Sequence, residues 1–404
     1  MLKKTLQTLA LLACCQLAFA APGQAAPATD SPAAAQPDED AWVARLTAWA
    51  DEFQIPEKDL PRNKEALRNL RKLDLDRVPS DNRNLPKITR LPPEIGQLQQ
   101  LEVLELRGNQ LSILPPEIGQ LQQLWLLGLR GNQLSALPAE ISQLQHLQEL
   151  DLGLNQFSTL PADIGALQQL QRLYLTDNQL SALPPEIGKL QQLQRLYLDG
   201  NRLTLPAEIG QLQQLQQLAL KNNQLTTLPP EIGQLQQLQY LNLEDNQLTA
   251  LPAKIGALQQ LETLSLRENQ LTALPPEIGQ LQQLRFLWIG NNQLATLPAE
   301  MGNLQKLQKL LLENNKLKAL PAEIGNLQHV RELRLHANQL TALPATIGQL
   351  QYLQGLTLDN NELTALPSTI IHLHNLQGLD IRGNRKLKLT PEQEQYLQGV
   401  SVYR

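Results

Sequence analysis

An asparagine recurs along this sequence with a period of 23 residues, interrupted by a single step of 22. A fixed period of this length predicts a solenoid, in which each coil buries its apolar face against the next. We therefore expect one long domain from most of the 404 residues, rather than two or three globular ones. The short step falls at 203–206, which lacks one residue of the pattern at 180–184. The thirteen marker asparagines are Asn109, Asn132, Asn155, Asn178, Asn201, Asn223, Asn246, Asn269, Asn292, Asn315, Asn338, Asn361 and Asn384.

Each repeat has a strand half and a turn half. Leu104 and Leu106 alternate with polar neighbours, which predicts a short strand with one buried face. The following stretch 114–119 contains prolines and a glutamate, residues that suit the first turn of a helix. It predicts a short helical turn with Ile118 and Leu121 pointing inward. Successive strands should then pair in parallel on one face, with the turns on the other.

The marker asparagine follows each strand at a bend. Its side-chain amide is suited to bind backbone groups that a turn leaves unpaired. The thirteen asparagines should form a ladder along the solenoid, and we interpret this ladder as structural rather than as a ligand site.

The residues Leu101-x-x-Leu104-x-Leu106-x-x-Asn109-x-Leu111 resemble the leucine-rich repeat (LRR) consensus. The turn half, Leu-Pro-x-Glu-Ile-Gly, is similar to the 23-residue subtype found in bacterial repeat proteins, including secreted ones, and in Ras-scaffolding repeat proteins. The resemblance covers residues 70–389, with a degenerate first copy at Leu70. It implies an α/β solenoid, a curved horseshoe with a parallel β-sheet on the concave face and short helical turns on the convex face. Such proteins mostly bind other proteins, and no catalytic residue is carried over.

Residues 1–20 have the pattern of a secretory signal peptide. Lys3 and Lys4 precede an apolar run, and the small-x-small sequence at 18–20 predicts cleavage after Ala20. A Sec-type export signal would send the protein to the periplasm, the cell surface or the medium. A membrane anchor is the alternative, but the apolar run is short for a span. Lipidation at Cys14 or Cys15 is a second alternative.

The predicted mature chain has a composition that excludes several function classes. Both cysteines lie in the leader, so disulfides and a thiol nucleophile are excluded. The net charge of −5 becomes about −7 without Lys3 and Lys4, which argues against nucleic acid or an anionic membrane as the main partner. No apolar run of about 18 residues follows the leader, so we expect no transmembrane segment after its removal.

The repeats are flanked by segments of different composition. Residues 21–40 are rich in Ala and Pro and predict a disordered linker. Residues 41–69 should form a helical N-terminal cap, beginning with a helix over 41–54. The stretch 77–87 is longer than the period allows and predicts a loop at the edge. Residues 390–404 predict a C-terminal cap, a short helix followed by an extended segment.

Two sets of strand positions vary from copy to copy and should face outward on the concave side. We call the residues six before each marker asparagine the first column, and those four before it the second column. Because parallel strands lie about 4.8 Å apart, Tyr174 and Tyr197 should stand side by side, with Glu149 able to pair with Arg172. Exposed aromatic and Arg side chains dominate protein interfaces. The candidate ligand-binding residues are Arg172, Tyr174, Arg195, Tyr197, Tyr240, Phe286 and Trp288.

The alternative interpretation is that these tyrosines fill space between strands and that the charged positions are simply solvated. Catalysis is not indicated: His372 and His374 occupy positions that are Gln elsewhere, two residues apart, so they do not share a helix face. The sequence has no nucleophile elbow, phosphate loop or metal-spaced cluster, and we expect no cofactor and no metal.

The sequence therefore favours a non-enzymatic, exported bacterial LRR protein that binds a protein or glycoprotein ligand of the host or the envelope on its concave sheet. We expect it to be a monomer. One alternative is a structural envelope component that self-associates. The other is an intracellular signalling scaffold resembling the Ras-binding repeat proteins, which the leader argues against.

Overall fold

The computed structural model describes residues 40–78 and 85–404, which belong to one compact unit. The predicted signal peptide, the lipidation alternatives and nearly all of the predicted linker lie outside these residues. So does part of the predicted edge loop, residues 79–84.

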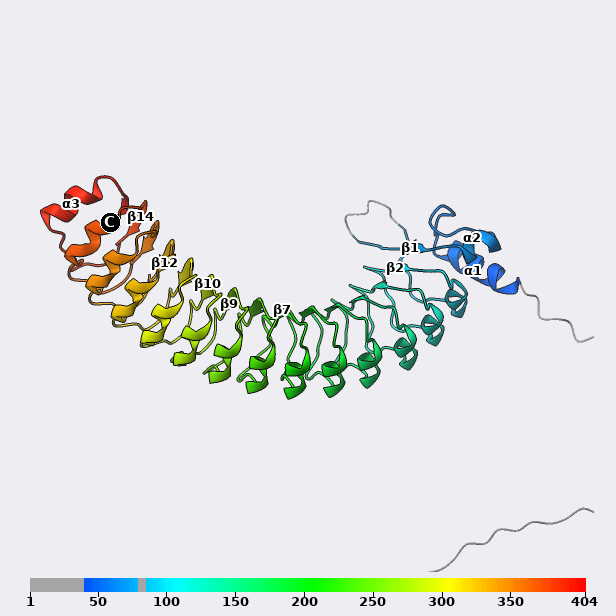
Figure 1. The fold of residues 1–404 in the computed structure, drawn as a ribbon. Helices are drawn as coiled ribbons and strands as arrows, with labels where there is room; N and C mark the ends of the chain where they lie inside the picture. The colour runs from blue at the N-terminus through cyan, green and yellow to red at the C-terminus, as the bar shows by residue number, and fades with distance from the viewer. Residues whose placement is uncertain (1–39, 79–84) are drawn as a thin grey trace, which may run out of the picture. The chain divides into compact units, whose positions relative to one another are not determined.

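The described residues form an open, curved solenoid with one sheet of fifteen parallel strands in sequence order. The sheet lines the concave side and the helical turns line the convex side (Figure 1). This confirms the predicted fold class. The strands are β1 Lys72–Asp74, β2 Val103–Glu105, β3 Leu126–Gly128, β4 Glu149–Asp151, β5 Arg172–Tyr174, β6 Arg195–Tyr197, β7 Gln217–Ala219, β8 Tyr240–Asn242, β9 Thr263–Ser265, β10 Phe286–Trp288, β11 Lys309–Leu311, β12 Glu332–Arg334, β13 Gly355–Thr357, β14 Gly378–Asp380 and β15 Ser401–Tyr403.

The convex turns are 3-10 helices of five residues, tighter than α-helices. Each is preceded by a proline at the N-cap, whose extended backbone ends the incoming segment. They are η1 Pro93–Gln97, η2 Pro116–Gln120, η3 Ala139–Gln143, η4 Ala162–Ala166, η5 Pro185–Lys189, η6 Ala207–Gln211, η7 Pro230–Gln234, η8 Ala253–Ala257, η9 Pro276–Gln280, η10 Ala299–Asn303, η11 Ala322–Asn326, η12 Ala345–Gln349 and η13 Ser368–His372.

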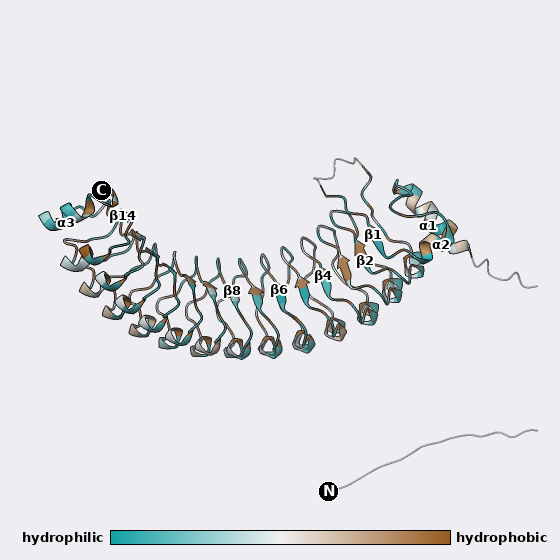
Figure 2. Cartoon of the chain, turned by 45° about the horizontal axis from the view of Figure 1, so that its top comes forward, coloured by the Kyte–Doolittle hydropathy of each residue, from teal (hydrophilic) through white to brown (hydrophobic). Residues whose placement is uncertain are grey.

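The core is an aliphatic ladder shared between neighbouring coils. Leu104, Leu106 and Ile118 are completely buried, and their equivalents are buried in the following coils. One exception to the leucine pattern is Phe157, the largest fully buried side chain. Figure 2 shows hydrophobic and hydrophilic residues interleaved within every coil. Because each coil packs mainly on its two neighbours, the core grows with length without becoming thicker.

The marker asparagines bind backbone groups of two successive coils. In one coil, Asn246 Nδ2 donates to the carbonyl oxygens of Leu220 and Leu243 at 2.9 and 3.0 Å. Its Oδ1 accepts from the backbone amides of Leu225 and Asn223 at 2.9 and 3.1 Å. The ladder therefore satisfies buried peptide groups that no strand or turn reaches.

Close contact between coils explains a glycine in most of the convex turns. A β-carbon at Gly279 would lie 2.2 Å from the carbonyl oxygen of Glu300 in the next coil, a distance that no side chain tolerates. A small serine, Ser142, replaces this glycine in η3. In η13 the position is Ile371, and the coil that follows carries an α-helix in place of a 3-10 turn.

Helices cover both ends of the ladder. At the N-terminus, α1 Ala41–Glu52 buries Trp42, Leu46 and Trp49, and α2 Lys64–Arg68 follows it. α1 ends two residues before the predicted boundary and packs beside η1. At the C-terminus, α3 Pro391–Leu397 starts with a capping box between Thr390 and Gln393, and β15 then adds a last strand to the sheet.

The two ends of the edge loop are anchored to the first coils. Lys87 Nζ donates hydrogen bonds to the carbonyl oxygens of Arg77 and Gly108, and the amide of Ile88 donates to Asn109 Oδ1 at 2.9 Å. The 22-residue step is absorbed locally: Thr204 still pairs with Ala182 as an isolated bridge.

Candidate binding surface on the concave sheet

The strand geometry determines which side chains reach the concave surface. Each strand has three residues, and the middle one is a fully buried leucine in β2 to β14. The first and third residues, which belong to the first and second columns, point away from the core. The register is uniform, so residues of one column lie side by side along the sheet, as in Arg172↔Arg195 and Tyr174↔Tyr197.

The seven predicted residues lie in two groups and one separate position. Arg172, Tyr174, Arg195 and Tyr197 come from the adjacent strands β5 and β6, Phe286 and Trp288 come from β10, and Tyr240 stands on β8 between them. All seven side chains are half-buried, whereas we expected them to be exposed. The reason is the narrow spacing of the strands, which presses each side chain against its neighbours in the column.

The first group is held together by stacking and charge. The rings of Tyr174 and Tyr197 are parallel within 1°, with centroids 5.0 Å apart. Tyr197 donates from its hydroxyl to Gln217 Oε1 at 2.6 Å. Arg172 Nη1 pairs with Glu149 Oε2 at 2.9 Å, as expected from the column. Partial burial raises the pKa of Tyr174 above its ordinary value.

The second group contains an aromatic pair in a single strand. Phe286 and Trp288 are tilted by 46° with centroids 6.4 Å apart, and the Arg285 guanidinium lies 5.6 Å from the Phe286 ring centre. Burial raises the pKa of Tyr240, which lies two strands away. The structure therefore places these aromatic side chains on the same surface without joining all of them into one patch.

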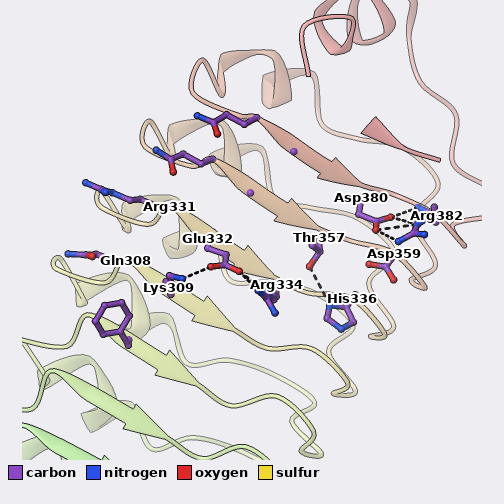
Figure 3. Close-up of a pocket in the computed structure, with 15 residues that line it drawn as sticks. Gln308, Lys309, Arg331, Glu332, Arg334, His336, Thr357, Asp359, Asp380 and Arg382 are labelled. Carbon is purple, nitrogen blue, oxygen red and sulfur yellow. Dashed lines mark hydrogen bonds and ion pairs between the residues drawn. The ribbon is translucent and has the colours of Figure 1, made fainter. Parts of the chain in front are cut away.

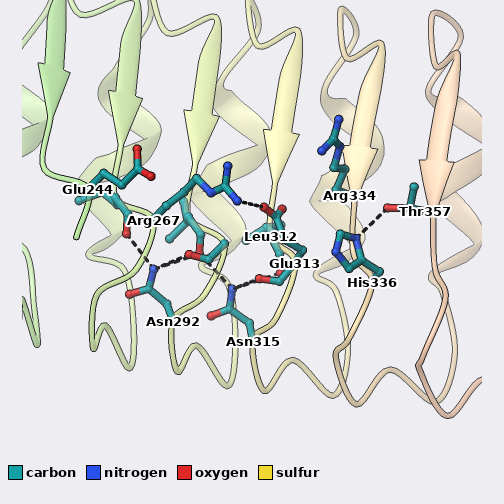
Figure 4. A network of polar contacts seen from close by, with 12 residues as sticks. Glu244, Arg267, Asn292, Leu312, Glu313, Asn315, Arg334, His336 and Thr357 are labelled. Carbon is teal, nitrogen blue, oxygen red and sulfur yellow. Dashed lines mark hydrogen bonds and ion pairs between the residues drawn. The ribbon is translucent and has the colours of Figure 1, made fainter. Parts of the chain in front are cut away.

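A third column, the residues two before each marker asparagine, was missed in the sequence analysis. Its residues vary from repeat to repeat as much as those of the other two columns, and this variation could have identified it. Its members lie just past the strand ends, several of them shown in Figure 4. They are Arg107, Arg130, Gly153, Thr176, Asp199, Lys221, Glu244, Arg267, Gly290, Glu313, His336, Asp359 and Arg382.

Two arginines of the third column reach past a glycine in the next coil and contact a residue of the coil after it. Arg267 Nη2 lies 3.3 Å from Glu313 Oε1 (Figure 4), and Gly290 is the third-column residue of the coil between them. A β-carbon at Gly290 would come within 2.5 Å of the Glu313 carboxylate, so the glycine leaves the room that this ion pair occupies. Glu313 is only 3% exposed. Arg130 crosses Gly153 in the same way to bind Thr176.

Carboxylates gather around Arg107 at the N-terminal end of the concave surface. Arg107 lies 3.4 Å from Glu105 and 3.6 Å from Asp151, and its backbone amide donates to Asp76 at 2.6 Å. Burial raises the pKa of Asp76 and Asp151. It raises the pKa of Glu105 from 4.5 to about 7, with Arg107 opposing the shift and the neighbouring carboxylates, which include Asp74, adding to it.

This shift predicts a stability change with pH. Between pH 4.5 and 7 the folded protein holds a proton on Glu105 that the unfolded chain has lost, so stability falls as pH rises through this window. Glu105→Gln removes the titration. We expect the variant to gain about 1–2 kcal/mol over the parent at pH 8, after allowance for solvent screening and the lost Arg107 pair, and no gain at pH 4.

Urea unfolding at both pH values tests this expectation. Glu362→Gln is the matched control, because Glu362 is exposed at a position that is usually Gln in the other repeats. A gain of Glu105→Gln that is equal at pH 4 and pH 8 would contradict the role of the proton.

No group of three His, Cys, Asp or Glu residues in the described part of the chain is arranged to hold a metal ion. No helix among residues 40–78 and 85–404 is long and apolar enough to cross a membrane. His336 Nδ1 lies 3.3 Å from Thr357 Oγ1, and His372 ends η13 on the convex side.

Comparison with known proteins gives the same fold. A model of the leucine-rich repeat region matches residues 57–153, 123–202, 151–228, 230–319 and 315–401. An LRR protein of Leptospira interrogans is 42% identical, with a TM-score of 0.76 over 87% of this chain and 94% of that one. A search of curated proteins finds no match.

Two further solved structures are more distant. The LRR ectodomain of the Arabidopsis thaliana receptor kinase GASSHO1/SCHENGEN3, solved in complex with Casparian strip integrity factor 2, is 31% identical. Its TM-score is 0.52 over 85% of this chain and 48% of that one. An internalin of Listeria monocytogenes shares the fold at 23% identity, with a TM-score of 0.67 over 83% of this chain and 94% of that one. Repeats matched over most of the chain and a solved relative at 42% identity show that this protein belongs to the leucine-rich repeat family.

Proposed function

We propose that this protein is a non-enzymatic binding module that holds a protein or glycoprotein ligand on its concave sheet. The observation that carries the proposal is the contrast between core and surface along the repeats. The central leucine is invariant through β2 to β14, whereas the neighbouring positions of the three columns change in charge, size and aromaticity. A rigid frame that displays a changing surface is suited to recognise one partner.

The proposed contact group is the stacked pair Tyr174 and Tyr197 with Arg172 and Arg195. Two half-buried tyrosines present large, rigid, amphipathic area at a low entropy cost. Arg195 has no ion pair among the described residues, so its guanidinium is available to a partner. The GASSHO1/SCHENGEN3 ectodomain, which shares the fold and is solved with a bound factor, supports the general mode.

Affinity capture with the immobilised full chain tests the proposal. We compare the parent with Tyr174→Thr/Tyr197→Thr, because threonine suits strands and leaves the core leucines untouched. The matched control is Tyr352→Thr, a tyrosine that is 54% exposed in the turn after η12 and stacks on His329. We expect a partner that the parent and the control capture and that the double variant binds at least about tenfold more weakly.

If circular dichroism shows all three proteins folded and the double variant captures the same partners as the parent, the tyrosines fill space and do not bind. Light scattering of the same samples addresses the self-associating alternative, which requires assembly that increases with concentration.

The proposal includes export. Residues 1–20 would direct secretion and be removed after Ala20, and residues 21–40 would link the new N-terminus to the fold. The residues 41–69 and 390–404 would serve as caps of the repeat domain 70–389. Mass spectrometry of the protein recovered from the producing cells and medium tests this part, since a chain that keeps its first twenty residues contradicts it.

A further inference from the structure

The C-terminal third of the concave surface contains an open hollow of about 950 Å³ (Figure 3). Strands β12, β13 and β14 form its floor, and Phe286 and Lys309 border it on the N-terminal side. Arg331 and Gln308 lie along one edge, where the strands begin. His336 and Asp359 lie along the opposite edge, in the third column. The hollow is thus as wide as a strand with its flanking residues, roughly 17 Å.

The depth of the hollow comes from two first-column positions, Gly355 and Gly378. Gly355 pairs in register with Glu332, and Gly378 pairs with Gly355. The preceding first-column residues, Lys309 and Glu332, have side chains that rise from the sheet. Neither glycine has a left-handed backbone, and a β-carbon at either would meet nothing within 4 Å. The fold therefore does not require glycine at these positions. What glycine provides there is close access to the backbone from the concave side.

The charges that line the hollow are mostly paired with one another. Glu332 binds both Lys309, at 3.0 Å, and Arg334, at 2.5 Å. Arg382 binds Asp380 at 2.6 Å.

The remaining charges leave one cation free. Asp359 accepts a hydrogen bond from the Asn360 amide at 2.9 Å. Arg331 is exposed and has no side-chain partner among the described residues. The lining holds four cationic side chains and three carboxylates, a local positive excess in a chain whose net charge is −5.

We propose that this hollow seats an extended acidic peptide segment of a partner, with a carboxylate side chain bound by Arg331. The inference rests on the proposed function and names the chemistry of its ligand. A peptide main chain fits over Gly355 and Gly378, because the absence of side chains lets another backbone approach. The amides of Gln354 and Gln377, which line the same hollow, both donate and accept and so match peptide groups. A guanidinium binds a carboxylate through two parallel hydrogen bonds.

The test uses the full chain and a library of randomised short peptides displayed on phage. Selected peptides are synthesised, and their affinity is measured by fluorescence polarisation. We expect enrichment of Asp and Glu over the unselected library. Arg331→Gln should weaken binding about tenfold and reduce its dependence on salt. Gly355→Leu/Gly378→Leu should weaken binding at least as much, since leucine fills the floor.

Two controls carry comparable substitutions outside the hollow. Arg202→Gln removes an exposed arginine at a position that is Gln in most other repeats, and Thr263→Leu enlarges a first-column residue on β9. Both should keep the parent affinity within about twofold. Thermal melts establish that each variant is folded, and Arg331→Gln decides the question if the leucine variant is not.

The results that overturn the inference differ from those that overturn the proposed function. Peptides that lose affinity for a third variant, Arg195→Gln in the contact group of the proposed function, but not for Arg331→Gln would support concave binding and reject this hollow. Selected peptides without acidic residues would also reject it. A library that yields no peptide bound to the concave face would count against both proposals.

Discussion

Asn246→Ala should lower the free energy of unfolding by about 3–5 kcal/mol. The side chain is 7% exposed and connects the backbones of successive coils. Removing it leaves the carbonyl oxygen of Leu220 and the amide of Leu225 buried without these partners. Each such orphaned group costs about 1–3 kcal/mol. Urea unfolding followed by circular dichroism measures the loss.

Gln247→Ala is the control, because Gln247 is the exposed neighbour of Asn246. We expect it to change stability by no more than about 0.5 kcal/mol. The transition of Asn246→Ala should also broaden, since a weakened contact between coils lets the two halves of the solenoid unfold separately. If the two variants were equally stable, the asparagine ladder would be dispensable.

Phe157→Ala should cost about 3–5 kcal/mol, because it opens a cavity among the aliphatic side chains of the neighbouring coils. Phe157 is completely buried and occupies the position of Leu134 and Leu180 in the adjacent coils. Phe157→Leu restores the residue of those coils and should cost less than about 1.5 kcal/mol. A small effect of both substitutions, again measured by urea unfolding, would mean that the coils close over the cavity.

The fold could be predicted because the same residue pattern occurs in every repeat. The alternation around Leu104 and the proline before Ile118 each carry weak information in one copy, but their recurrence fixes the register of all the strands. The helix type of the convex turns, α or 3-10, could not be predicted from this pattern. Five residues following a proline suit an α-helix or a 3-10 helix equally, and the structure contains the 3-10 form.

For the candidate surface, the sequence predicted only the contacts between residues of the same column in adjacent strands. Stacking of Tyr174 on Tyr197 follows from the period, since equivalent positions must be neighbours. The Arg267 and Glu313 pair does not, because it depends on a missing side chain at Gly290 in the intervening coil. The raised pKa of Glu105 likewise depends on burial among side chains of several coils, which no single repeat reveals.

The contact between Gly279 and Glu300 has a consequence for how such an array can change in length. A unit with glycine in its turn accepts a copy of itself on its C-terminal side, because the approaching carbonyl oxygen meets no side chain. The unit that carries Ile371 does not, since a branched side chain would stand where the next turn must pack. Gene duplication can therefore lengthen this solenoid by copying an internal unit. A copy of the η13 unit cannot be stacked in the same way, so duplication of this unit alone would not extend the array.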